Sequence, residues 1–413
     1  MKFLQLLPQS NKLSLLLISS LFLFLGDAIL SYLFPVLVEQ TVLSFTLVGI
    51  IMATSSTAGL IFDLIFPIFF PSLSWRTNHA IGVVLGLLFP ITLFLGRDLN
   101  QPILFVISAI CWGVYYEFLG FARQEAIVEI DKEKNFTKTW GIMYSFLSFC
   151  AFVGPIVASI TLSADQVVAR AVVFILYFIS IIFALVLLRI PDDKNLTINR
   201  ESKFLHVLSF VSEIKYWAVI ESKTYPMLLV LIFLTIVNSF FWTFGGLFGE
   251  AEFGGMGLGW ILIVSYTLPE LLFSFGFSRM IIKKRKKVLS FAFLILAGLT
   301  VVPLIVIHNN FLLLIVVSVF SGFGAVSAIL MRAVFSDLES RAKEFDVHIE
   351  AIYQSTHSVG YIIGPLLAGL LVQTFGFYTT FIIFGFISII LGSFLLLVTP
   401  QKLKLPIKRL RQI

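Results

Sequence analysis

Long apolar stretches separated by short polar ones occupy almost the whole sequence. A spanning helix needs about 20 apolar residues to cross roughly 30 Å of hydrocarbon. The pattern therefore predicts twelve transmembrane helices, at residues 14–38, 44–70, 79–96, 103–128, 139–162, 168–189, 225–248, 258–281, 288–307, 311–335, 348–373 and 377–399. The predicted fold class is an all-α integral membrane protein.

The composition agrees with this prediction. Hydrophobic residues make up 59% of the chain and charged residues only 13%, whereas soluble domains have about 45–50% apolar and about 25% charged residues. A soluble globular domain is therefore excluded. The two cysteines, Cys111 and Cys150, lie inside apolar helices and have no metal-ligand spacing, so no metal site is predicted.

One long polar segment divides the spans into two sets of six. Within it, Val207, Leu208, Val211 and Ile214 recur at helical spacing, which indicates an amphipathic helix on the membrane surface. The predicted domains are a first six-helix bundle, a cytoplasmic linker, a second six-helix bundle and a basic tail, at 1–189, 190–224, 225–399 and 400–413.

The basic residues orient the chain. If both termini are cytoplasmic, only Arg97 and Arg170 of the 29 basic residues fall on the outer side, as the positive-inside rule requires. The basic run at 283–287 is then a topology signal, preferred to a lipid-binding or nucleic-acid patch. We expect a multi-pass protein of the plasma (inner) membrane with no nucleic-acid partner.

The two halves resemble each other at a nearly constant offset. Asp27 in the first span corresponds to Asn238 in the seventh, and Ser31 to Trp242, both at an offset of 211. Gly154 in the fifth span corresponds to Gly364 in the eleventh at an offset of 210. Two six-helix halves repeated in parallel are typical of a transporter.

The chain resembles the major facilitator superfamily, most clearly in the fifth span. Drug/proton antiporters of that superfamily carry G-x8-G-x3-G-P-x2-G-G there. The matching positions here, and their echo in the eleventh span, form a predicted helix-packing motif: Gly141, Gly154, Pro155, Gly360, Gly364 and Pro365. Small residues at such spacing let helices approach closely.

Other motifs of the superfamily are altered. The loop after the second span should read G-x-L-x-D-R-x-G-R, and residues 71–79 read PSLSWRTNH. Arg76 is kept, but Trp75 replaces the aspartate that latches the inner gate in the superfamily. No arginine is identified at the position expected in the fourth span of the antiporters.

The resemblance implies that spans one, four, seven and ten line a central cavity. Asp27 and Glu117 lie in the middle of spans one and four, where a carboxylate costs roughly 2.5–3.5 kcal/mol. We predict that the two together bind protons or a cationic substrate, with Ser31, Tyr116, Asn238 and Trp242 as further cavity residues. The alternative for either carboxylate is a structural hydrogen bond between helices.

Five further polar residues are candidate gate or relay groups: Asp63, Arg76, Arg123, Glu270 and His357. Asp63 and Glu270 lie on helices flanking the expected cavity, and structural pairing is an equal alternative. For His357, a hydrogen-bonded packing role is the preferred interpretation over a proton relay. For Arg123, a place in a solvated, salt-bridged helix end is preferred over substrate contact.

The predicted function is secondary active transport by alternating access. Proton-coupled export of small amphiphilic or cationic compounds is the first form; symport of a sugar or other metabolite and lipid flipping are the alternatives. A membrane-embedded enzyme is disfavoured because no nucleophile or metal cluster stands out, and no phosphate-binding loop is present. We expect no cofactor, and a monomer whose partners are a small-molecule substrate, protons and the lipid bilayer.

Overall fold

The structure is a computed structural model of the chain. It describes residues 11–69, 73–130, 136–164, 166–189, 206–254, 258–277, 285–342, 346–400 and 410. Most of the predicted linker and tail, 190–205 and 401–413 apart from residue 410, lies outside the described residues.

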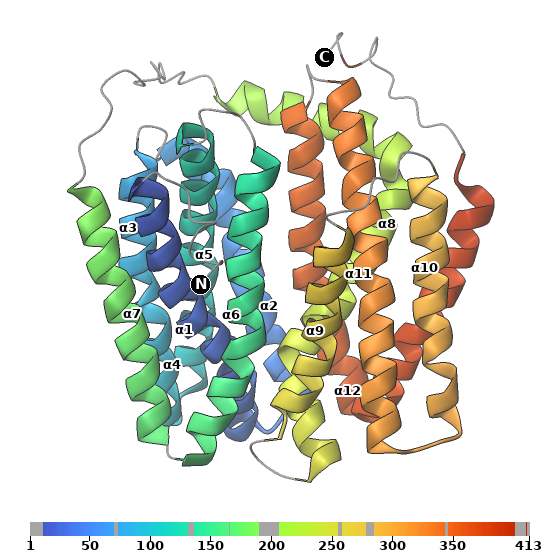
Figure 1. Cartoon of the computed structure of the whole chain (residues 1–413), viewed down its shortest axis with the longest axis horizontal. Helices are drawn as coiled ribbons and strands as arrows, with labels where there is room; N and C mark the ends of the chain where they lie inside the picture. The colour runs from blue at the N-terminus through green and yellow to red at the C-terminus, as the bar shows by residue number, and fades with distance from the viewer. Residues whose placement is uncertain are drawn as a thin grey trace. The chain divides into compact units, whose positions relative to one another are not determined.

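The described chain is helical, and no strand occurs in it, which confirms the all-α class (Figure 1). Its helices are α1 (Asn11–Val42), α2 (Phe45–Phe69), α3 (Trp75–Gly86), α4 (Leu88–Asp98), α5 (Pro102–Ile130), α6 (Phe136–Ala164), α7 (Gln166–Leu188), α8 (His206–Phe253), α9 (Trp260–Phe277), α10 (Lys286–Thr300), the 3₁₀ helix η2 (Val302–Ile305), α11 (Asn310–Arg341) and α12 (Asp346–Val398).

The helices follow the predicted apolar segments, with four differences in their bounds. The third segment is divided between α3 and α4, and the ninth between α10 and η2. The linker helix and the seventh segment form one helix, α8. The last two segments form α12, joined through the non-helical residue Gly376. Nine stretches in the described chain are long and apolar enough to cross a membrane, so the protein is an integral, multi-pass membrane protein.

The chain forms two compact units. Unit 1 comprises residues 1–44, 54–202 and 256–260, and unit 2 comprises 45–53, 203–255 and 261–413. Unit 2 therefore takes the first turns of α2 and the whole of α8, which the predicted boundaries at 189 and 225 do not anticipate. The arrangement of twelve spans in two six-helix bundles stays a prediction.

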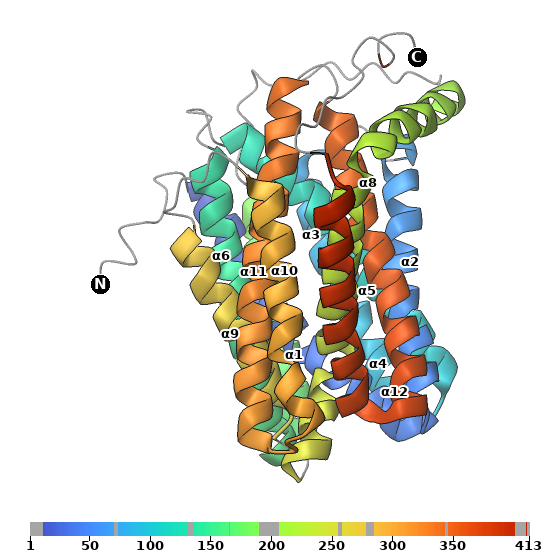
Figure 2. The same ribbon diagram turned by 90° about the vertical axis from the view of Figure 1, so that its right-hand side faces the viewer.

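The packing within each unit repeats. In unit 1, α1 packs against α6 and α7, and in unit 2, α8 packs against α12 (Figures 1 and 2). A Cβ on Gly154 of α6 would lie 2.8 Å from the carbonyl carbon of Ala28 on α1. A Cβ on Gly364 of α12 would lie 3.0 Å from the Cβ of Ser239 on α8 and would overlap its hydroxyl. Only glycine permits these approaches.

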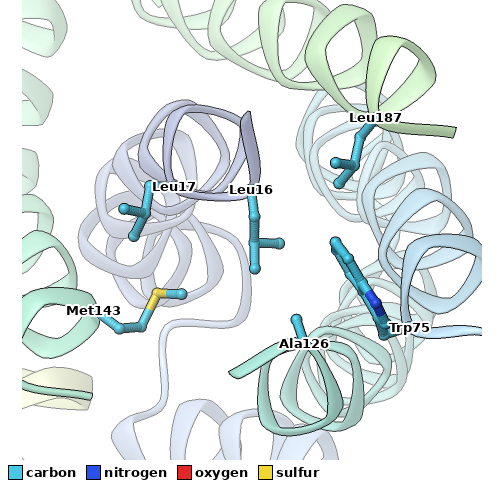
Figure 3. Packing of buried hydrophobic residues seen from close by; sticks show 6 residues of the cluster. All are labelled: Leu16, Leu17, Trp75, Ala126, Met143 and Leu187. Atoms are coloured by element: carbon cyan, nitrogen blue, oxygen red, sulfur yellow. The ribbon is translucent and has the colours of Figure 1, made fainter. Parts of the chain in front are cut away.

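An apolar layer closes unit 1 near the start of α1. Figure 3 shows its six buried side chains, which come from five helices: Leu16, Leu17, Trp75, Ala126, Met143 and Leu187. Each of them is at most 1% exposed.

Candidate functional site

Asp27 lies in the middle of α1 and is only 7% exposed. Its Oδ1 accepts a hydrogen bond from the Tyr115 hydroxyl of α5. The hydroxyl of Tyr177, on α7, lies 3.3 Å from that of Tyr115. The carboxyl group is therefore enclosed by polar groups from two neighbouring helices.

A close helix approach brings these groups together. A Cβ on Gly26 would lie 2.8 Å from the Tyr177 ring, so glycine at this position lets α7 come close to α1 beside Asp27. Both tyrosines are at most 1% exposed. Because neither can reach water, their hydroxyls find partners in each other and in Asp27.

Two residues predicted beside Asp27 lie differently. The hydroxyl of Ser31 donates to the Asp27 backbone carbonyl at 2.8 Å, within α1. Glu117 lies against α2, where a Cβ on Gly59 would be 3.1 Å from its Oε1. Asp27 faces Tyr115 and Glu117 faces α2, so the structure does not bring the two carboxylates together.

Arg123 is buried at 7% exposure, and the prediction of a solvated helix end is wrong for this residue. Its guanidinium carbon lies 4.6 Å from the ring centroid of Phe24 on α1 and 5.6 Å from that of Tyr116. Its Nε donates to the Leu119 carbonyl at 3.1 Å. A cation packed on aromatic faces is stabilised without an ion pair, which explains how the arginine is tolerated here.

Tyr116 is the partly open member of this group, at 41% exposure. Its ring also meets Phe24 edge-on, with centroids 5.9 Å apart. Of the predicted cavity residues in unit 1, it exposes the largest described side-chain surface.

A second polar layer includes His79, which the sequence analysis did not single out. The His79 ring is fully buried, and its Nε2 lies 2.9 Å from the Ser19 hydroxyl of α1. Ser19 and Ser180 of α7 also exchange hydrogen bonds, with the Ser180 hydroxyl donating to the Ser19 carbonyl at 2.8 Å. In the sequence, the signal for a buried His79 was its place at the start of the predicted span 79–96, followed by apolar residues.

Arg76 lies at the start of α3 and is 3% exposed. Its guanidinium carbon is 5.5 Å from the Trp75 ring centroid, and Trp75 belongs to the apolar layer of Figure 3. The tryptophan that replaces the expected aspartate therefore contributes packing surface. The side chain of Asp63, another predicted gate residue, lies outside the described residues.

The candidate residues of unit 2 form a less connected set. Asn238 and Trp242 of α8 are half-buried, and Asn238 Oδ1 has no hydrogen-bond partner among the described residues. On α9, Glu270 is half-buried one turn beyond Tyr266, whose ring stacks on Phe241 with centroids 4.1 Å apart. His357 packs beside Tyr361 of its own helix, with ring centroids 5.0 Å apart.

The packing-motif residues occur on α6 and α12. Pro155 and Pro365 lie inside these helices, next to Gly154 and Gly364. A Cβ on Gly360 would lie 2.6 Å from Thr235 Cβ, so α12 stays close to α8 over a full turn. Gly141 is helical, but its surroundings lie outside the described residues.

Among the described residues, no three His, Cys, Asp or Glu side chains gather as metal ligands would. The polar groups of unit 1 suit a different chemistry. One carboxyl group, one guanidinium and several hydroxyls lie within a few helical turns, which is an arrangement able to hold and exchange a proton.

Comparison with protein families finds a match for the second part of the chain. Residues 227–412 match the model of the Major Facilitator Superfamily. No curated protein is similar in sequence to this chain.

Solved structures share the fold over almost the full length. A crystal structure of the nucleoside transporter NupG matches with a TM-score of 0.71 and 16% identity, covering 95% of this chain and 100% of that chain. A structure from work on substrate recognition in proton dependent oligopeptide transporters matches with a TM-score of 0.68 and 10% identity, covering 97% and 99%. The chain is therefore similar to the Major Facilitator Superfamily in sequence over residues 227–412, and it shares the fold of these solved transporters.

Proposed function

We propose that this protein is a secondary transporter, working by alternating access, whose transport is coupled to protons through Asp27. The observation that carries the proposal is the place of this carboxyl group. It is buried in the middle of a 29-residue apolar stretch, and it accepts a hydrogen bond from the Tyr115 hydroxyl. Ionisable groups at such depth are costly and typically functional.

The coupling follows from the cost of burying charge. The ionised form of Asp27 accepts the Tyr115 hydrogen bond and carries a charge, whereas the protonated form is neutral and easier to bury. A conformation that opens Asp27 to water favours the ionised form, and one that closes around it favours the protonated form. Proton binding and the transport conformation are then linked.

Export of small amphiphilic or cationic compounds is the first form of this proposal. Tyr116 offers a partly open aromatic face, at 41% exposure, to which a lipophilic cation can bind. The proposal keeps the expected topology of twelve spans in an inner membrane with both termini in the cytoplasm.

Symport of a polar metabolite is the second candidate, and the burial of Arg123 favours it. A guanidinium inside unit 1 repels a cationic substrate and suits one that carries carbonyl or carboxylate oxygens. The solved structures with the same fold are those of the nucleoside transporter NupG and of a protein from work on proton dependent oligopeptide transporters.

The test compares wild type, Asp27→Asn and Glu39→Gln in proteoliposomes with an inward-acid pH gradient. Internal pH is recorded while cationic, neutral and anionic compounds are added. We expect coupled proton flux in the wild type and in Glu39→Gln, whose half-buried carboxylate lies near the end of the same helix. Asp27→Asn should fall to the level of protein-free liposomes.

The compound that moves protons, and the direction in which they move, decides between export and symport. Unchanged coupled flux in Asp27→Asn would refute the role of this residue. If no compound moves protons through the wild type, the proton-coupled form of the proposal fails.

A further inference from the structure

Tyr177 places a hydroxyl group inside an otherwise apolar stretch of α7. From residue 171 to residue 188, the only polar side chains of this helix are Tyr177 and Ser180. Ser180 is paired with Ser19 of α1, and Tyr177 is fully buried, with its hydroxyl 3.3 Å from that of Tyr115. A phenylalanine would bury the same apolar ring, so the hydroxyl has a role that packing does not explain.

Two glycines hold the Tyr177 ring by its opposite edges. A Cβ on Gly26 of α1 would lie 2.8 Å from Cε2 of this ring, and one on Gly86 at the end of α3 would lie 3.3 Å from Cε1. The same Cβ on Gly86 would lie 3.4 Å from the Tyr115 ring. Because a larger residue at either position would press on the rings, the two glycines let the two tyrosines lie side by side.

The number of protons fixes the direction of the hydrogen bonds when Asp27 is ionised. A carboxylate only accepts hydrogen bonds, and a tyrosine hydroxyl has one proton to donate. Tyr115 donates its proton to Asp27 Oδ1, so its oxygen accepts from Tyr177. The two bonds then run in series toward the negative charge, an arrangement in which each bond strengthens the other. In the protonated form of Asp27 this charge is absent, so the series stabilises that form less.

The other titratable groups around Asp27 make their contacts elsewhere. Arg123, on α5, is its charged neighbour, and the guanidinium packs on aromatic rings. Cys150, on α6, is a further titratable neighbour, and its thiol donates to the Leu21 carbonyl at 3.5 Å. Among the described titratable groups, the tyrosines of α5 and α7 are therefore the ones that reach the carboxyl group through hydrogen bonds.

We propose that Tyr177 is a positioning residue that sets the proton affinity of Asp27 through Tyr115. Its donated hydrogen bond stabilises the ionised form, so the hydroxyl makes Asp27 release its proton more readily. Asp27 lies on α1 and Tyr177 on α7, and these two helices pack against each other. A movement that parts α7 from α1 would break the series and tighten the hold of Asp27 on its proton. Tyr177 thus adds to the proposed function, on which this role rests, because Asp27 is the proton-binding group there.

The test measures the protonation of Asp27 directly, by infrared spectroscopy of the full-length protein in detergent micelles at a series of pH values. The C=O stretch of the protonated Asp27 carboxyl group is the band that is missing in Asp27→Asn. Tyr177→Phe keeps the ring between the two glycines and removes the hydroxyl. This variant should raise the proton affinity of Asp27 about 2–10-fold, the effect of losing one net hydrogen bond. The band should therefore persist to higher pH than in the wild type.

A double-mutant cycle separates this role from a structural one. Tyr115→Phe removes the bond to the charged group itself and should raise the proton affinity about 10–100-fold. Because Tyr177 acts through Tyr115, the double variant Tyr115→Phe/Tyr177→Phe should titrate as Tyr115→Phe does. Tyr177→Leu also lacks the hydroxyl, and it provides a readout if Tyr177→Phe does not fold.

Tyr378→Phe is the matched control. The Tyr378 hydroxyl also makes a hydrogen bond, to the Ile307 carbonyl at 3.1 Å, but in unit 2. This variant should leave the titration of Asp27 at its wild-type midpoint.

Two results would overturn the proposal. If folded Tyr177→Phe, or Tyr177→Leu in its place, titrates as the wild type does, the hydroxyl only satisfies the packing around it. If the double variant shifts the titration beyond Tyr115→Phe alone, Tyr177 acts on Asp27 by another route. The titration needs no transported compound, so a failure here is distinguishable from a failure of proton coupling in the proteoliposome assay.

Discussion

The contact between α1 and α6 in unit 1 and the contact between α8 and α12 in unit 2 are built alike. Gly154 meets Ala28 in the first, and Gly364 meets Ser239 in the second. Ala28 and Ser239 are 211 positions apart, and Gly154 and Gly364 are 210 apart. These are the offsets at which the two halves of the sequence resemble each other.

The residues beside these contacts differ in chemistry. Asp27, next to Ala28, is bonded to Tyr115, whereas Asn238, next to Ser239, has an unpartnered Oδ1 among the described residues. The helix packing is thus duplicated and the ionisable chemistry is not. Close packing constrains both halves to small residues, but only the first half holds an enclosed carboxylate at this position.

The largest effect is expected from exchanging these two residues. In the double variant Asp27→Asn/Asn238→Asp, coupled proton flux should fall from the wild-type level to that of protein-free liposomes, as in Asp27→Asn alone. The new carboxylate at 238 would have no tyrosine donor like Tyr115. The proteoliposome assay measures this, and restored flux would show that either half can carry the proton.

Replacing Gly154 or Gly364 by alanine should lower stability for a different reason in each half. Gly154→Ala should destabilise the protein by about 1–3 kcal/mol, as overpacking does, because its Cβ meets the rigid backbone of Ala28. In Gly364→Ala the principal obstacle is the Ser239 hydroxyl, so adding Ser239→Ala should recover part of the loss. Apparent thermal midpoints of the purified variants measure both effects. If adding Ser239→Ala recovers none of the stability lost in Gly364→Ala, this interpretation is wrong.

Two buried serine pairs provide the smallest contrast. Ser19 and Ser180 in unit 1, and Ser290 and Ser327 in unit 2, each exchange hydrogen bonds. Ser290→Ala should cost about 0.5–1.5 kcal/mol, the usual net value of such bonds.

Ser19→Ala should cost more than Ser290→Ala, because it also removes the described partner of His79 Nε2. An unsatisfied buried group adds about 1–3 kcal/mol. The same thermal midpoints measure this, and equal losses in the two variants would show that the His79 contact adds nothing.

Much of the fold is predictable from the sequence because bilayer thickness sets a simple rule. Apolar runs of about 20 residues became helices, and the repeat offset placed Gly154 and Gly364 at corresponding positions of a predicted helix-packing motif. The apolar runs could not predict where a helix breaks or where two segments join into one helix. The break at Leu87 between α3 and α4, and the fusion of the linker with the seventh segment into α8, depend on local backbone geometry.

The site is less predictable because a sequence gives the depth of a residue but not its direction around the helix. Asp27 and Glu117 were expected to face one cavity, yet Glu117 lies against α2 at Gly59. Arg123 lies inside the predicted span 103–128, and that position, rather than its acidic neighbours in sequence, was the better guide to its burial. Its aromatic partner Phe24 is 99 residues away in the chain and could not be read from spacing.

Gly376 has a consequence for how the end of the chain enters the bilayer. Its φ of 78°, which side chains rarely adopt, is the only interruption in the 44-residue apolar stretch Ser355–Val398. That stretch is about twice the length of one span, and no polar loop divides it. The two apolar segments are therefore joined by the turn at Gly376 alone, and residues 373–376 are exposed at this turn.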